Sequence, residues 1–317
     1  MPIALVPRGK DTEKALTRES MNVKDFLFRA GTAALSCIAV SMVLFVTGYV
    51  FFESADFLRN TSLPRFLLGG DWDPIGGETF EILPAVLGTV YVSALAVLLS
   101  LPLALGTSLC LCYYLRGKKK YMASACLDMI AGIPSVIVGF AGMLTLVPFL
   151  ERSFDLAAGE SVLAAGIALG FMLLPFEISF MMETFDKFML QYESAALAIG
   201  LDKLYVLTSL GLPCSKGAVF SAAMLALARG MGETMAVMMV IGNANLFPKL
   251  MGKSITIPAR IALEMGMAEV GSSHYKALFA AAFVLIVIVF VLNAAARLCS
   301  RLTIGHSAEF SSMDKKR

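Results

Sequence analysis

The sequence predicts an all-α, polytopic membrane protein with six transmembrane helices. Of the 317 residues, 58% are hydrophobic and only 16% are charged, whereas soluble domains carry about 25% charged residues. The mean hydropathy is +0.77. Six apolar stretches are each long enough to cross a bilayer, which takes roughly 20 residues. We therefore expect lipid, rather than water, to meet much of the surface.

The six predicted spans follow one another along most of the chain. Their approximate bounds are 30–52, 83–115, 121–150, 161–185, 217–244 and 275–299. Pro102, Gly132, Pro134 and Pro175 interrupt some of them, and such breaks are tolerated where neighbouring helices or a cavity satisfy the backbone. The polar segment before the first span, residues 1–29, has no small-residue cleavage site, which indicates an anchor rather than a removed signal peptide.

Composition argues against several classes of function. The net charge of +2 is too small to predict binding to nucleic acid. Five of the six cysteines fall within or beside apolar runs and Cys214 lies in a basic loop, so we expect small hydrophobic side chains rather than disulfides. Cys110 and Cys112 have neither a second cysteine pair nor nearby histidines, so no metal site is predicted.

The distribution of lysine and arginine predicts the orientation in the membrane. Eighteen of these residues fall on the side that holds both termini and the loops at 116–120 and 187–216, and seven fall on the opposite side. Cytoplasmic segments carry the basic excess, so both termini are predicted to be cytoplasmic. The loop at 53–81, predicted to lie outside, is acidic and contains the only tryptophan, Trp72.

The fifth span contains an arginine and a glutamate at membrane depth. Charges there are costly and usually face a partner or a wet path. Arg229 and Glu233 are four residues apart, so we expect them to lie on one face of the helix, and Gly230 and Gly232 allow close backbone approach beside them. A guanidinium suits a tetrahedral oxyanion, and Glu233 would hold it when no substrate is present. The pattern alone fits a structural ion pair equally well.

Three other carboxylates lie in or near the predicted spans. They are Asp128, Glu177 and Glu183. Their positions near predicted helix ends or proline breaks favour interfacial or structural roles, and we assign none of them to a substrate.

A long polar connection joins the fourth and fifth spans. It runs from Asp186 to Pro213, which is too long for a tight turn. Helix-forming residues precede Gly200 and a second amphipathic segment follows it, so two short helices are expected to meet at a sharp angle there. Such a surface could dock a soluble partner, although the pattern alone fits a plain connector better.

At these residues the chain resembles the permease subunits of bacterial ABC importers, specifically phosphate permeases of the PstC type. The connection resembles the EAA motif that docks on the ATPase, and residues 229–236 with Gly242-Asn243 resemble the signature RAxGETMA followed by GN. Residues 131–139 resemble the family segment AGIPSVVYG, and residues 72–89 resemble the start of its second span. The likeness covers roughly residues 70–300.

The resemblance implies a type I importer permease, or MetI-like, fold in a plasma (inner) membrane. It implies a permease domain at 30–300 with a core at about 84–300 and a coupling loop at about 186–215, between cytoplasmic tails at 1–29 and 301–317. The partners would be a sister permease of the PstA type, two ATPase subunits of the PstB type and an extracytoplasmic phosphate-binding protein of the PstS type. This chain would hold no cofactor, because ATP and magnesium belong to the ATPase.

The same resemblance assigns residues to two sites. It implicates Arg229 and Glu233 in phosphate passage, and we add Thr234 of the same signature. Coupling to the ATPase is assigned to these motif positions: Glu193, Ser194, Ala195, Ala196, Gly200 and Pro213. Alignment on Gly200 and Pro213 puts Ser194 at the glutamate of the motif, so the docking role of that glutamate would pass to Glu193 or be weakened.

Competing functions have less support in the sequence. Gly252-Lys253-Ser254 ends like a phosphate-binding loop, but Phe247 replaces the first glycine that this loop requires. His274 and His306 lie outside the predicted spans, so no buried catalytic cluster is proposed for an intramembrane enzyme. Inverted repeats typical of secondary transporters are not evident. A permease for sulfate, molybdate or phosphonate remains the main alternative.

Overall fold

The computed structural model describes residues 23–314, and the side chains of residues 28–298. The chain divides into two compact units at Val50 and Phe51. In the first unit the described part is the beginning of α2 (Val23–Asn60), a single helix. Its side chains from Phe28 to Val46 are all exposed, as expected of a helix that faces lipid. Most of the predicted N-terminal tail lies outside the described residues.

Within the described residues, five helices are long and apolar enough to span a membrane. A further pair of helices, bent at a short break, makes a sixth span if the two are taken together. The five are Phe28–Asn60, Leu83–Tyr114, Ser135–Phe154, Val162–Ala198 and Ser273–Leu298. The bent pair is Lys203–Cys214 with Lys216–Met231, at 64° to each other. The all-α membrane fold predicted from the sequence is therefore confirmed, with different bounds for several spans.

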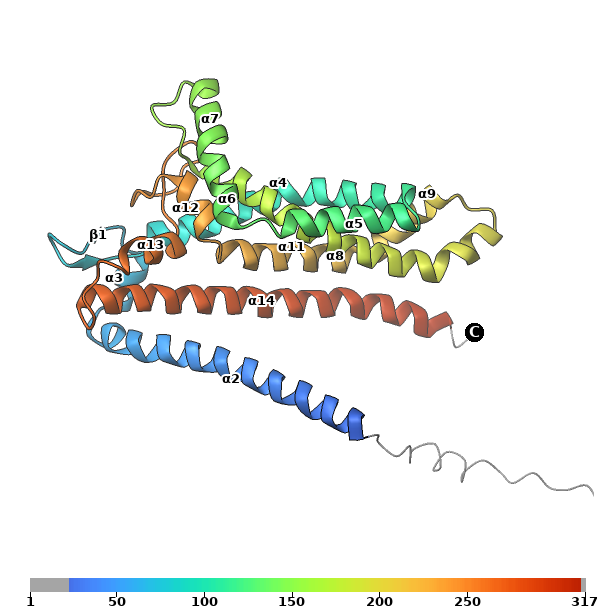
Figure 1. Cartoon of the computed structure of the whole chain (residues 1–317), viewed down its shortest axis with the longest axis horizontal. Helices are drawn as coiled ribbons and strands as arrows, with labels where there is room; N and C mark the ends of the chain where they lie inside the picture. The colour runs from blue at the N-terminus through green and yellow to red at the C-terminus, as the bar shows by residue number, and fades with distance from the viewer. Residues whose placement is uncertain (1–22, 315–317) are drawn as a thin grey trace, which may run out of the picture. The chain divides into compact units, whose positions relative to one another are not determined.

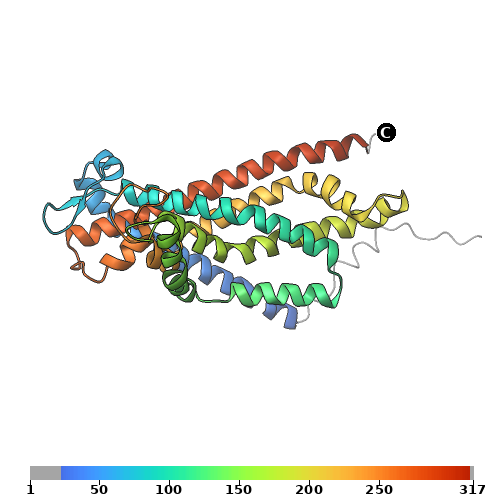
Figure 2. The same cartoon turned by 90° about the horizontal axis from the view of Figure 1, so that it is seen from above.

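The centre of the second unit is the packing of α4 (Leu83–Tyr114) against α8 (Val162–Ala198) and α11 (Lys216–Met231) (Figures 1 and 2). Small residues bring these helices together, as is usual in membranes. A methyl group on Gly170 would lie 3.1 Å from the Ala96 carbonyl oxygen, so a larger residue would push α4 and α8 apart. Pro102 and Pro175 lie inside α4 and α8 without ending them, so the prediction that they interrupt spans is wrong.

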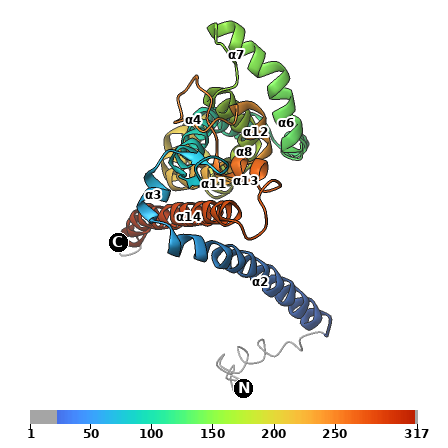
Figure 3. The same cartoon turned by 90° about the vertical axis from the view of Figure 1, so that its left-hand side faces the viewer.

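Two other predicted spans are broken, the third of them at the predicted positions Gly132 and Pro134. The third becomes α5 (Lys118–Ala131), α6 (Ser135–Ala141), the π-helical turn Gly142–Leu146 and α7 (Val147–Phe154). The break falls at Gly132–Pro134, where proline cannot donate a helical hydrogen bond. The fifth becomes α11 and α12 (Met235–Ile241). Figures 1 and 3 show α7 extending away from the α4–α8–α11 bundle.

The predicted connection between the fourth and fifth spans is mostly helical. Its first half continues α8 without interruption as far as Ala198, so the short separate helix expected before Gly200 is wrong. After Gly200 come α9 (Lys203–Tyr205), the π-helical turn Val206–Gly211 and α10 (Leu212–Cys214). We call residues 186–215 the coupling segment. α14 (Ser273–Asp314) then runs beyond the predicted sixth span.

A small folded cap lies at the end of the second unit opposite the coupling segment (Figure 1). It consists of α3 (Leu63–Leu68), an antiparallel pair of β1 (Trp72–Asp73) and β2 (Thr79–Phe80), α13 (Ile257–Glu264) and the first turn of α14. In the β pair Trp72 faces Phe80. Phe57, Phe66 and Phe80 form edge-to-face contacts in its apolar core.

Candidate functional site

Arg229 and Glu233 lie on either side of a helix end. α11 ends at Met231, and the backbone N–H of Glu233 donates to the Gly230 carbonyl at 3.1 Å. The Glu233 carboxylate then accepts a hydrogen bond from the Ala236 N–H at 3.3 Å, at the beginning of α12. The prediction that both residues share one face of a continuous helix is therefore wrong, because the helix stops between them.

The same pocket nevertheless contains both side chains. It has a volume of about 210 Å³ and is lined by Ile130, Ala131, Ile133, Ser135, Val138, Phe171, Met172, Arg229 and Glu233. Its walls come from the end of α5, the beginning of α6 and the middle of α8. Two broken helices and one continuous helix thus enclose a cation and a carboxylate among apolar side chains.

The Arg229 guanidinium is available to a ligand. Its carbon Cζ lies 5.4 Å from the centre of the Phe176 ring, and the side chain is exposed in this chain. Among the described residues no hydrogen bond or ion pair engages it, so the predicted pairing with Glu233 is not formed here. Aromatic stacking of this kind orients a guanidinium while leaving its N–H donors open.

Close backbone packing holds the two helix breaks together. A methyl group on Gly139 of α6 would lie 2.8 Å from the Cα of Ala236 in α12, and one on Gly230 would lie 3.3 Å from Leu169. Because the neighbours of Gly230 are side-chain atoms, the close backbone approach predicted there is not present; side chains of α4 and α8 fill the space beside it. Thr234 is adjacent to the pocket but does not line it, and its hydroxyl donates to the Gly232 carbonyl at 3.4 Å.

The residues assigned to coupling fall into two groups. Ser194, Ala195, Gly200 and Pro213 are exposed at the end of the molecule. Ala196 is buried and packs in an apolar cluster between α4, α8 and the coupling segment. Glu193 forms an ion pair with Arg116 at the turn between α4 and α5, so its carboxylate has a partner within this chain.

Exposed apolar side chains surround Gly200. Leu190, Leu197, Ile199, Leu204 and Tyr205 are all large and between about half and nearly fully exposed. Gly200 itself has φ of +80°, a conformation that favours glycine. This surface has the character of a contact site rather than of a solvated turn.

The location of Glu177 differs from the one expected from the sequence. Glu177 was expected near a helix end or a proline break with an interfacial role, but it is completely buried inside α8. Both its oxygens lack a hydrogen-bond partner within the described residues. The other two, Asp128 in α5 and Glu183 in α8, are not buried.

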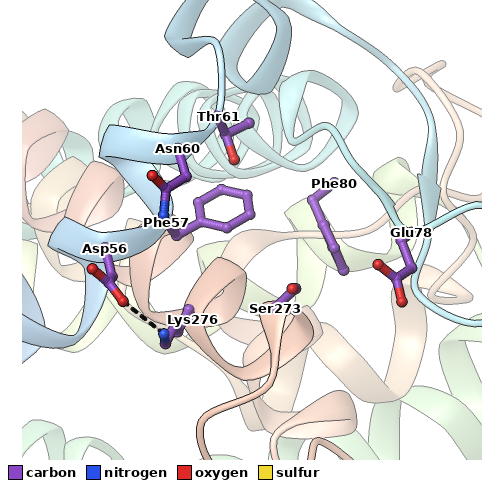
Figure 4. Close-up of a pocket in the computed structure, with 8 residues that line it drawn as sticks. All are labelled: Asp56, Phe57, Asn60, Thr61, Glu78, Phe80, Ser273 and Lys276. Atoms are coloured by element: carbon purple, nitrogen blue, oxygen red, sulfur yellow. Dashed lines mark hydrogen bonds and ion pairs between the residues drawn. The ribbon is translucent and has the colours of Figure 1, made fainter.

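The cap holds two further pockets. The first, of about 210 Å³, lies between the end of α2, the β pair and the beginning of α14 (Figure 4), and the second, of about 320 Å³, lies between the end of α2, α3 and the β pair. Lys276 lines the first, and its Nζ lies 2.8 Å from the Asp56 carboxylate. Arg65 lines the second, and its Nε lies 3.0 Å from Glu81. Because each cation already has a carboxylate, these pockets suit an anion less well than the Arg229 pocket does.

Comparison with known proteins agrees with this architecture. Residues 96–304 match the family described as the binding-protein-dependent transport system inner membrane component. The phosphate transport system permease protein PstC of Mesorhizobium japonicum is 31% identical over 92% of this chain and 94% of its own length. A probable phosphate transport system permease protein PstC of Methanocaldococcus jannaschii is 30% identical over 82% of this chain and 89% of its own length.

A solved structure shows the same fold. It is a chain of the MetNI methionine ABC transporter, with a TM-score of 0.55 and 15% sequence identity over 70% of this chain and 95% of that chain. The MetI-like permease fold expected from the sequence is thus confirmed. This chain is a multi-pass membrane protein that belongs to the family of inner-membrane components of binding-protein-dependent transport systems, and to the PstC group of permeases within it.

Proposed function

We propose that this chain is one permease half of an ATP-driven phosphate importer. The observation that carries the proposal is the Arg229 guanidinium, which lines a pocket among apolar side chains and has no hydrogen bond or ion pair within the described chain. A charge at membrane depth without a structural partner points to a passing anion. The relatives named as phosphate permeases supply the identity of that anion.

The carboxylate of Glu233 favours phosphate over sulfate and molybdate. Inorganic phosphate keeps a proton near neutral pH, so it can accept hydrogen bonds from a guanidinium and donate one to a carboxylate. Sulfate and molybdate carry no proton at that pH and would meet only repulsion from Glu233. A pocket that places both groups beside the same space therefore matches a protonated oxyanion.

The remaining parts of the proposal concern partners and orientation. The exposed apolar surface around Gly200 suits an ATPase subunit, which would bind ATP and magnesium, and this chain would act as a transport component without its own nucleotide site. A sister permease would complete the pathway and an extracytoplasmic phosphate-binding protein would deliver the substrate. The coupling segment and both termini would face the cytoplasm, as the basic residues predict.

Alternating access gives the mechanism. Closure of the ATPase dimer would move the coupling segment, and the helices would tilt at the breaks between α5 and α6 and between α11 and α12. Such breaks are where backbone rotation is least opposed by helical hydrogen bonds. The Arg229 pocket would then open to one side of the membrane and later to the other.

Uptake by vesicles that contain the whole complex tests the substrate. Radioactive phosphate should accumulate only when ATP is present on the side of the membrane where the ATPase lies. A hundredfold excess of sulfate, molybdate or phosphonate should change the rate of phosphate uptake by no more than about twofold. Competition by one of these anions as effective as that by unlabelled phosphate would instead assign the chain to that anion.

Substitution at Gly200 tests the coupling segment. A side chain at φ of +80° is strained by about 1–2 kcal/mol, and no atom lies within 4 Å of the position, so the effect is on backbone conformation alone. Gly200→Val should release the ATPase or uncouple hydrolysis from uptake. Gly200→Asn is the control, because asparagine tolerates this conformation. Normal coupled transport by the valine variant would contradict the assignment.

A further inference from the structure

Two helices that line the Arg229 pocket, α5 and α8, are also joined by an ion pair at the coupling segment. Ala131 lies at the end of α5 and Met172 lies in α8, and both line the pocket. At 1.5 Å per residue, Lys120 lies about 16 Å along α5 from Ala131, and Asp186 lies about 21 Å along α8 from Met172. The Lys120 ammonium and the Asp186 carboxylate form an ion pair there.

This ion pair is partly buried and joins three helices. The side chains of Lys120 and Asp186 are 21% and 33% exposed. The Cys112 thiol of α4 donates to the same Asp186 oxygen at 3.3 Å, and the Lys120 ammonium lies 3.9 Å from the Cys112 sulfur. Partial burial and a shared acceptor distinguish this ion pair from an isolated surface pair, which contributes little to stability.

Two more contacts tie the coupling segment to the turn between α4 and α5. Arg116 forms an ion pair with Glu193 near the end of α8. The Lys203 ammonium of α9 donates to the Tyr113 carbonyl at 2.9 Å and lies 5.7 Å from the Tyr113 ring centre. All of these contacts join the same turn to the coupling segment.

α5 needs such a tie because little else holds it. None of its side chains is buried, although its partly buried Leu127 packs against the apolar cluster of α4 and α8, so apolar packing alone fixes it only weakly. The break at Gly132–Pro134 also separates it from α6, so α6 cannot hold it in line. Without the ion pair, α8 could move while α5 lagged behind, and the two pocket walls would then separate.

We infer that Lys120 and Asp186 are positioning residues that make α5 and α8 move as one body with the coupling segment, so that motion at the ATPase contact reaches both walls of the Arg229 pocket. The inference rests on the proposed transport function, since it concerns how that function is coupled. Neither residue touches the substrate. The ion pair acts on how much transport each ATP hydrolysis produces, not on anion recognition.

Exchange of the two charges tests this inference in the reconstituted importer. Lys120→Glu and Asp186→Lys should each lower the phosphate imported per ATP hydrolysed at least fivefold, while copurification with the ATPase and the hydrolysis rate stay within about twofold. The double variant restores an ion pair and should return the ratio to within twofold of the original. Lys119→Glu, an exposed neighbour with the same charge change, is the matched control and should leave the ratio unaltered.

Several outcomes would overturn the inference. One is that the single variants import as much phosphate per ATP hydrolysed as the original protein. Another is that the double variant imports as little per ATP as the single variants. A third is that the Lys119→Glu control loses as much transport per ATP as they do. If charge reversal prevents assembly, Lys120→Gln removes the pair without repulsion and is judged by the same ratio. Failure of the proposed function is recognised separately, because the unaltered importer would then not transport phosphate, and the ratio would be measured with the anion that it does transport.

Discussion

Arg229 and Arg260 are two arginines of one membrane protein in opposite circumstances. Arg260, in α13 of the cap, is 1% exposed, and its Nη2 donates to Asn245 at 2.5 Å. Its Cζ lies 4.4 Å from the centre of the Trp72 ring. Arg229 is exposed in a pocket, and within the described residues its guanidinium stacks on an aromatic ring without a hydrogen bond or an ion pair. The difference teaches that geometry, not residue type, separates an arginine that holds the fold from one that is open to a ligand.

The cap gives Arg260 a hydrogen bond through Nη2 and a nearby carboxylate, while its buried Nε and Nη1 have no hydrogen-bond partner within the described residues. Glu264 lies 3.9 Å from its Nε and also accepts hydrogen bonds at 2.8 Å from Trp72 and from the His274 ring. Burial lowers the pKa of Arg260 to about 10, so the side chain is still charged at neutral pH and needs these partners. Asn245 in turn donates to the Gly70 carbonyl at 3.0 Å, which connects the cap to the loop after α12.

The largest effect on transport is expected from a substitution at Arg229. Arg229→Gln should reduce phosphate uptake about 100-fold, because loss of a charged partner for a buried anion costs about 3 kcal/mol. The amount of protein in the membrane and the melting temperature of the purified complex should stay as they were. Uptake that is unchanged, with normal protein levels, would refute the site; Arg229→Lys, which keeps the charge without the fork, should retain part of the activity.

The reverse pattern is expected at Arg260. Arg260→Gln removes the stacking on Trp72 and leaves Glu264 without its nearby guanidinium, which should destabilise the cap by about 2–3 kcal/mol. Thermal unfolding of the detergent-solubilised complex would show a lower melting temperature. Uptake per folded complex should stay within about twofold. A strong loss of uptake with unaltered stability would instead mean that both arginines serve the anion.

The sequence predicted the first, second, fourth and sixth spans well, because apolar length alone specifies them, but it missed the break in the fifth and the shifted bounds of the third and fifth. It also singled out Arg229 and Glu233, since few charges lie at membrane depth; both line one pocket, and their role in anion passage stays a prediction. It did not show that α11 ends at Met231, although Gly232 stands at the C-cap position, because the glycines of this segment were interpreted as sites of close packing rather than as a helix end. The stacking on Phe176 and the ion pair of Arg116 with Glu193 join residues far apart in sequence, and such contacts depend on packing that local patterns do not encode. Pro102 and Pro175 were misread because neighbouring helices tolerate a single lost hydrogen bond.

The smallest expected effect concerns Glu81, a carboxylate of the cap. Hydrogen bonds from the Asp71 N–H at 2.8 Å and from Arg65 at 3.0 Å hold the pKa of Glu81 below its usual value. A carboxyl with a depressed pKa stabilises the fold above the pKa of the unfolded chain and loses that contribution as pH falls through the folded value. Glu81→Gln should therefore lower the melting temperature by about 2 °C at pH 7.

The decisive measurement for Glu81 is the dependence of that difference on pH. The gap between the original protein and Glu81→Gln should shrink as the pH is lowered below about 4, because the original carboxyl is then protonated as well. Glu78→Gln is a matched control, since Glu78 is an exposed neighbour in the same loop and should show a smaller difference at every pH. A difference in melting temperature that stays constant across this range would mean that Glu81 acts through its shape and hydrogen bonds rather than its charge. The ion pairs of the cap would then have no electrostatic role in stability, and this contrast with the Arg229 pocket would be lost.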